Sequence, residues 1–160
     1  MEPNLLTAAF VAALLLSLLV KLWLATRQMR HVAAHRHAVP AAFAGSVPLE
    51  AHQRAADYTL AKGRLGLATT AIGTATVVAW TLLGGLDTLN TALRDAIMPA
   101  YGPMAYQLAL LTAVSLIGGL IDLPAEWIAT FRLEQRFGFN RTTPRLWWAD
   151  QAKGVLLGAA

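Results

Sequence analysis

Long uninterrupted runs of apolar residues dominate the pattern along this chain. A hydrocarbon core about 30 Å thick needs roughly 20 helical residues to cross it, because each helical residue adds about 1.5 Å. Three segments reach that length with few or no charged residues: 5–24, 65–86 and 104–123. The pattern therefore predicts an all-α, polytopic membrane protein with three transmembrane helices.

A fourth apolar run begins at Gly154 and reaches Ala160, where the sequence ends. This run is too short to cross a bilayer. We interpret it as the start of a fourth transmembrane helix and expect the chain to be part of a longer protein.

The first apolar segment has a second interpretation, as a secretory signal peptide. Such a peptide begins with a positively charged region, but Met1 to Asn4 carry no positive charge. Lys21 and Trp23 lie near the end of the segment, and both residue types suit a membrane interface. A retained transmembrane helix is therefore the better interpretation.

The basic residues predict how these spans are oriented. Segment 87–103 carries only Arg94, against Asp87 and Asp95. Because cytoplasmic connections are enriched in Lys and Arg, the two basic segments, 25–64 and 124–153, are predicted to be cytoplasmic and helical. The N-terminus and the loop from Pro99 to Pro103 then lie outside. The basic residues of the two segments are Arg27, Arg30, Arg36, Arg54, Lys62 and Arg64, and then Arg132, Arg136, Arg141, Arg145 and Lys153.

The first basic segment is predicted to divide at Pro40. Residues 27–38 contain good helix formers and extend the first span. A turn follows from Pro40 to Pro48, and Ser46 is a candidate N-cap for a helix with Glu50 in its first turn. That helix is predicted to run through Tyr58 into the second span.

Composition agrees with a membrane protein. Hydrophobic residues make up 56% of the chain and charged residues 14%, where soluble domains carry about 25% charged residues. The absence of cysteine excludes disulfides and cysteine-ligated metal sites. The net charge of +4 comes from residues that flank apolar runs, so no nucleic-acid partner is expected, and Trp147-Trp148 beside Arg145 is interpreted as an interfacial anchor.

Two groups of side chains could carry chemistry. His31 and His35 have the i, i+4 spacing of an H-E-x-x-H zinc motif, but Val32 stands where the catalytic Glu would be. The carboxylates Asp122, Glu126 and Glu134 could act in acid–base chemistry or bind a cation. Solvated interface histidines, and charge pairing with Arg132 and Arg136, are the simpler interpretations.

The stretch 123–154 carries a more specific signal. It contains Leu123-Pro124, Phe131, the run from Glu134 to Asn140, Thr143, and Asp150 followed by Lys153-Gly154. It is similar to the pattern L-P…F…E-x-x-F-G-F-N…T…D-x-x-K-G of the N-terminal region of the CAAX prenyl protease 1 family. Residues 55–62 resemble that family's A-x-x-Y-x-x-x-K stretch, with Tyr58 and Lys62 at the matching positions. Trp23-Leu24 with Arg27, Arg30 and Pro40 is similar to the bacterial members of the family, so the resemblance implies a bacterial inner membrane.

The resemblance implies a multi-span zinc metalloprotease whose helices enclose an intramembrane chamber and which cleaves peptides or prenylated CAAX proteins. The family's zinc ligands come from a later region with H-E-x-x-H and a downstream Glu. This chain contains no H-E-x-x-H, so none of its residues is assigned as catalytic or metal-ligating, and zinc is expected only in the full-length family. Residues 1–160 are expected to form a single membrane-embedded N-terminal domain, inactive alone, whose partners are the bilayer and the missing C-terminal catalytic region.

The motif residues are predicted to act as a scaffold for the chamber wall. Gly138 is expected to allow a tight or left-handed turn, Asn140 to cap the following segment, and Glu134 and Asp150 to pair with nearby cations. A stand-alone membrane binding or assembly module is the alternative, and a small transporter subunit is less well supported. The full scaffold set is Tyr58, Lys62, Leu123, Pro124, Glu134, Phe137, Gly138, Phe139, Asn140, Asp150 and Lys153.

Overall fold

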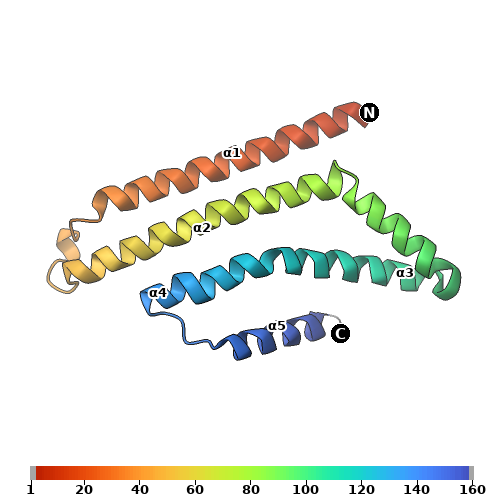
Figure 1. The fold of residues 1–160 in the computed structure, drawn as a ribbon. Coiled ribbons are helices and arrows are strands. Elements are labelled where there is room, and N and C mark those ends of the chain that lie inside the picture. Colours follow the sequence, from red (N-terminus) through yellow and green to blue (C-terminus); the bar gives the residue numbers. More distant parts are fainter. Residues whose placement is uncertain (1–2, 159–160) are drawn as a thin grey trace. The chain divides into compact units, whose positions relative to one another are not determined.

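The computed structural model describes residues 3–158, and over that range it consists of helices and turns without a strand (Figure 1). The predicted all-α class is thus confirmed. The chain divides into two compact units, Met1–Ala75 and Thr76–Ala160. The elements in chain order are α1 (Pro3–His35), the 3-10 helix η1 (Ala41–Phe43), α2 (Leu49–Thr81), α3 (Gly85–Ile128), the π-helix η2 (Ala129–Glu134), α4 (Gln135–Phe137) and α5 (Pro144–Gly158).

In the first unit, α1 and the beginning of α2 run antiparallel, side by side (Figure 1). Arg36 lies on the connection, and its Nη2 is 2.9 Å from Oδ2 of Asp57 on α2. Nε2 of His52 lies 3.0 Å from the carbonyl oxygen of His35. Further along, a Cβ on Gly63 would come within 2.8 Å of the Met29 sulfur. Glycine at this position therefore leaves room for the Met29 side chain against α2.

The connection between these helices follows the prediction in outline. α1 continues past the first span to His35, and α2 runs from Leu49 through Tyr58 without a break. The expected N-cap is wrong, because the Ser46 hydroxyl lies 3.3 Å from the Phe43 carbonyl oxygen, to which it donates. Pro48 directly precedes α2 instead, and its carbonyl accepts from the His52 amide at 3.1 Å.

The second predicted span, 65–86, ends earlier than expected. α2 stops at Thr81, and Gly84 takes the left-handed conformation with φ 77°. A Cβ on Gly85 would lie 2.8 Å from the Ala79 carbonyl oxygen, so the chain can turn this tightly only with glycine there. Leu86 consequently belongs to the next helix, α3.

The predicted connection at 87–103 is also corrected, because most of it is helical. α3 runs from Gly85 to Ile128 and is interrupted at Gly102, with φ 80° and ψ 176°. Proline disfavours the α conformation in the residue before it, and Pro103 directly follows this glycine. The proline cluster that suggested a loop therefore produces one sharp kink, and the polar residues before it continue the helix.

Two helical stretches of the described residues, Asn4–His35 and Gly85–Phe137, are long and apolar enough to cross a bilayer, and their apolar windows are not buried within the chain. α2 is less apolar, because its first half carries charged residues and its second half several threonines. Their hydroxyls are satisfied within the helix: Thr70 donates to the Gly66 carbonyl at 2.8 Å and Thr74 to the Thr70 carbonyl at 2.9 Å. Such bonding lowers the cost of placing hydroxyls in an apolar environment.

Candidate functional site

The sharp turn after α3 contains most of the motif residues. The helix passes through the π-helical turn Ala129–Glu134 and ends at Phe137. Gly138 follows with φ 78° and ψ 16°, the left-handed conformation. The Phe139 amide donates to the Glu134 carbonyl at 2.9 Å, and the Gly138 amide donates to the Gln135 carbonyl at 3.2 Å. This pair of bonds is a Schellman motif, in which glycine supplies the positive φ and the last carbonyls of the helix find donors. The left-handed turn predicted at Gly138 is therefore present.

The segment after this turn is fixed by side-chain oxygens. Asn140 Oδ1 accepts from the Thr142 amide at 2.7 Å, which closes an Asx turn. Thr143 Oγ1 accepts from the Leu146 amide at 3.3 Å, and Pro144 occupies the first position of α5. Thr143 is thus the N-cap of α5, with proline in its favoured place. The expected cap at Asn140 is corrected: this residue shapes the loop before the helix.

Four aromatic rings join the end of α3 to α5. Trp147, only 7% exposed, packs edge-on against Trp127 with ring centroids 5.2 Å apart, and against Trp148 at 4.9 Å. The ring centroids of Phe131 and Trp127 are 4.2 Å apart. Aromatic pairs in these geometries contribute about 0.5–1.5 kcal/mol each beyond the area they bury. This aromatic cluster (Trp127, Phe131, Trp147 and Trp148) therefore packs the end of α3 and the π-helical turn against α5.

Sequence reasoning missed the part that Trp127 plays in this cluster. Trp127 and Phe131 are four residues apart, so they share one helix face. The adjacent Trp147-Trp148 pair was interpreted as an interfacial anchor only. Trp148 does remain 54% exposed, which agrees with an interfacial position, but Trp147 is buried. An aromatic pair at i, i+4 followed by a second aromatic pair is the signal that could have predicted the contact.

The acidic residues of the motif region are distributed between two contacts. Asp150 lies 3.5 Å from Lys153, as predicted. Glu126 accepts from the Gln151 amide nitrogen at 2.8 Å. The expected pairing of Glu134 with a cation is absent from the ion pairs of residues 3–158, and Glu134 contributes through its backbone carbonyl. The Asp150–Lys153 ion pair is exposed and contributes at most about 1 kcal/mol.

A cleft of about 390 Å³ lies between α3 and α5 beside these carboxylates. Leu123 contributes to its apolar wall, while Asp122, Glu126 and Gln151 supply polar atoms. Pro124 lies one residue further along α3. The cleft contains no histidine, so the arrangement has two carboxylates and an amide but no third metal-ligating group.

Tyr58 and Lys62, the remaining motif residues, belong to the first unit. They lie one turn apart on α2, with the Lys62 ammonium 5.8 Å from the centre of the Tyr58 ring. A cation at this distance over an aromatic face is attracted by the ring quadrupole. The Tyr58 ring therefore helps to hold the Lys62 ammonium against the surface of α2.

His31 and His35 lie in the last turns of α1, and their rings pack against each other. The rings of His31 and His35 are 4.2 Å apart, and His35 Nδ1 lies 2.8 Å from the His31 carbonyl oxygen. Because a carbonyl only accepts, His35 donates through Nδ1. Within residues 3–158, no three His, Asp or Glu side chains are close enough to hold a metal ion.

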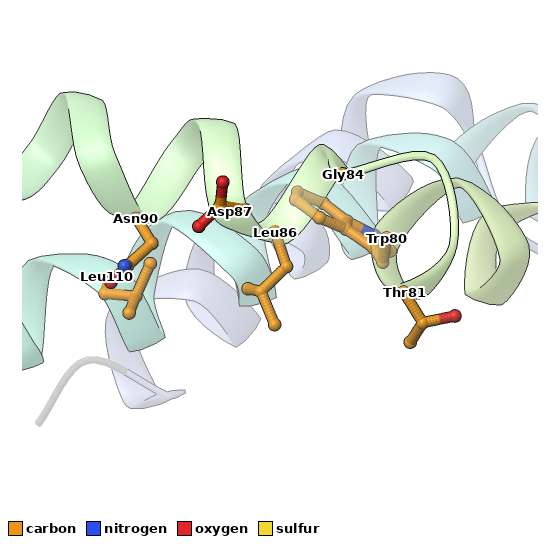
Figure 2. A pocket seen from close by; sticks show the side chains of 7 residues that line it. All are labelled: Trp80, Thr81, Gly84, Leu86, Asp87, Asn90 and Leu110. Atoms are coloured by element: carbon orange, nitrogen blue, oxygen red, sulfur yellow. The ribbon is translucent and has the colours of Figure 1, made fainter. Parts of the chain in front are cut away.

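A second cleft, of about 450 Å³, lies at the turn between α2 and α3. Figure 2 shows the side chains that line it, among them Trp80, Asn90 and Leu110. The Tyr106 hydroxyl donates to Asn90 Oδ1, which connects the two halves of α3 across the kink. The lining has one carboxylate and no nucleophile paired with a base, so it offers no catalytic arrangement.

Comparisons with known proteins extend this description. Residues 28–160 match the family model described as "CAAX prenyl protease N-terminal, five membrane helices". "CAAX prenyl protease 1" of Saccharomyces cerevisiae is 33% identical over 76 residues, which cover 45% of this chain and 17% of that protein. The crystal structure of S. mikatae Ste24p superposes with a TM-score of 0.83 at 22% identity, covering 91% of this chain and 34% of that one.

The structural match establishes the fold, and the chain spans about a third of the Ste24p chain. The family match covers most of the 160 residues. The chain is therefore an integral membrane protein that belongs to the CAAX prenyl protease N-terminal family.

Proposed function

We propose that this chain forms part of the intramembrane chamber wall of a CAAX prenyl protease-type zinc metalloendopeptidase and takes no direct part in catalysis. The observation that carries the proposal is how the motif residues are used. Gly138 ends a helix, Asn140 shapes a loop and Asp150 pairs with Lys153. The contacts of Gly138 and Asn140 fix backbone geometry, as expected of a scaffold that positions helices, and Asp150 adds an exposed ion pair on α5.

The chemistry of peptide hydrolysis is proposed to come from residues outside these 160. A zinc protease needs three protein ligands and a general base near the metal-bound water. The sequence contains no H-E-x-x-H, and the nearest approach, His31 and His35, has Val32 between them. Zinc, the CAAX-type substrate and the catalytic region are thus proposed partners of this chain.

A chimera tests the chamber-wall proposal. Residues 28–160 would replace the corresponding N-terminal membrane part of the S. cerevisiae CAAX prenyl protease 1, and cleavage of a farnesylated CAAX peptide would be measured in membranes. We expect the chimera to retain cleavage and bound zinc, and the same chimera with Gly138→Val to lose activity. A chimera that inserts, binds zinc and yet cleaves no substrate would contradict the proposal.

The purified 160-residue chain provides the second arm. We expect it to bind no stoichiometric zinc and to leave the farnesylated peptide intact. Zinc-dependent hydrolysis by this chain alone would show that it is an enzyme in its own right and overturn the non-catalytic assignment. A chain that is inactive both alone and in the chimera, although well folded, would favour the membrane binding or assembly module.

A further inference from the structure

The antiparallel packing in the first unit brings basic residues from two distant parts of the sequence to one level. Met29 lies against Gly63, and Arg36 pairs with Asp57. These two contacts set the register between α1 and α2, so that a residue i on α1 lies level with about residue 92 − i on α2. Arg30 is therefore level with Lys62.

The same register places Arg27 and Arg64 within about one turn of that level, since each helical residue advances about 1.5 Å. The four cations Arg27, Arg30, Lys62 and Arg64 form what we call the basic layer, within about 5 Å along the helix axes. All four side chains are exposed.

Among the described residues of the first unit, both carboxylates already have a cationic partner outside the basic layer. Over residues 3–75 the sequence has only Glu50 and Asp57 as acids. Glu50 lies 3.0 Å from Arg54, and Asp57 lies 2.9 Å from Arg36. Lys62 and Arg64 are two residues apart on α2 and do not share a helix face, so the four charges do not all face one another. Like charges that do share a side of the helix pair repel one another in the absence of an anion, and the layer therefore favours a negatively charged partner.

The surroundings of the basic layer favour an amphiphile. It begins three residues beyond the predicted first span, 5–24. Trp23 is 59% exposed with Arg27 5.4 Å from its ring centre, and Leu16, Leu19 and Val20 are exposed on the apolar side. A phosphate at the cations would leave acyl chains against these apolar residues.

We propose that the basic layer is a binding site for the phosphate headgroup of an anionic phospholipid, on the side of the membrane predicted to be cytoplasmic. Clusters of Lys and Arg just beyond a membrane helix attract anionic lipids. Here Arg30 and Arg64 each follow the contact pair Met29 and Gly63 by one residue on antiparallel helices, so they lie on the same side of the helix pair. One lipid on that side would contact both helices. The proposal does not depend on the protease assignment.

Native mass spectrometry of the detergent-purified 160-residue chain tests the site, with phosphatidylglycerol and phosphatidylcholine added separately. We expect phosphatidylglycerol to be retained in preference to phosphatidylcholine. The double variant R30Q/R64Q should bind phosphatidylglycerol about thirty-fold more weakly, the change expected from removing two juxtamembrane cations. The charge-conserving R30K/R64K variant should retain binding.

A matched control removes the same charge from the other basic segment. R141Q/R145Q lowers the net charge equally but leaves the basic layer intact, so we expect little loss. An equal loss in both doubles would overturn the site, because net charge alone would then explain binding. Equal retention of the two lipids would also overturn it.

Inorganic phosphate distinguishes a lipid site from a general anion site. We expect it to displace phosphatidylglycerol poorly, because it lacks acyl chains to contact the apolar residues beside the layer. Displacement by phosphate at concentrations similar to the lipid would overturn the commitment to a phospholipid. Circular dichroism of each variant checks that its helix content equals that of the unaltered chain.

Discussion

Replacing Gly138 by valine tests whether the F-G-F-N turn depends on a left-handed backbone. Gly138 has φ 78° and ψ 16°, and its amide and that of Phe139 close the Schellman motif. Valine at this position can adopt the same left-handed conformation only at a cost in free energy. Otherwise both backbone hydrogen bonds are lost, and the loop that leads to α5 is no longer held at its start. The change therefore acts on the backbone at the end of α3 and α4.

The magnitude follows from the local geometry. A left-handed conformation costs an L-residue roughly 1–2 kcal/mol, and a β-branched side chain falls at the upper end. No heavy atom lies within 4 Å of the position a Cβ would take, so no steric clash adds to this value. We expect Gly138→Val to lower the free energy of unfolding by about 2 kcal/mol and Gly138→Asn to cost less, since asparagine tolerates the left-handed region.

The assay is unfolding of the detergent-solubilised chain by SDS, followed by tryptophan fluorescence from the aromatic cluster. Gly102 provides a matched control, because its φ of 80° and ψ of 176° fall in a region open essentially only to glycine. Asparagine should therefore be tolerated at Gly138 and not at Gly102. Equal stability of Gly138→Val and the unaltered chain, or equal penalties for Asn and Val at Gly138, would refute the reasoning.

Three further predictions follow from the same structure. Trp147→Leu should destabilise the chain by up to about 3 kcal/mol, and Trp148→Leu by clearly less because that ring is 54% exposed; equal losses in the SDS assay would contradict the packing. Tyr106→Phe should cost about 1 kcal/mol by removing the hydrogen bond across the α3 kink, and an unchanged unfolding curve would argue against that bond. Since the chain has no cysteine, Ser46→Cys and Tyr101→Cys each introduce one thiol; in intact bacterial cells an impermeant maleimide should label only Tyr101→Cys, and the reverse pattern would invert the predicted orientation.

The sequence predicted the helical class and the α1–α2 connection because those depend on local patterns. Apolar runs long enough to span a bilayer have few alternatives to helix, since every backbone group must be satisfied internally. Proline at 40 and 48 marked the interval between the helices, and α1 ends and α2 begins within a few residues of the predicted points. The left-handed Gly138 was also predictable, because glycine between two phenylalanines suggests a helix end.

The wrong predictions concern segments whose local composition favours a different structure from the one that forms, or contacts between distant residues. Segment 87–103 has three charged residues and two prolines, and this composition favours a loop. The segment is nevertheless helical up to Gly102, whose backbone dihedral angles interrupt the helix. The stop of α2 at Thr81 depends on Gly84 and Gly85, two glycines in an apolar run that also suit a membrane helix. The contact of Trp127 with Trp147 joins residues twenty positions apart, and a periodicity analysis does not reach that far.

The distribution of buried residues connects the scaffold proposal to the physical chemistry of the chain. Among residues 3–158, the buried apolar side chains are Ala56, Leu133 and Trp147. Each lies in a segment predicted to be cytoplasmic, 25–64 or 124–153, whereas the apolar windows of the membrane-crossing stretches are not buried at all. Packing within the chain is thus concentrated in its two basic segments, and the apolar helix surfaces must be covered by lipid or by other helices. A chamber wall has these requirements, because its turns must be fixed locally while its flat apolar faces stay available for neighbours. Stability in SDS should accordingly respond strongly to changes at Leu133 or Trp147, and weakly to leucine-to-alanine changes at exposed positions in the first span such as Leu16.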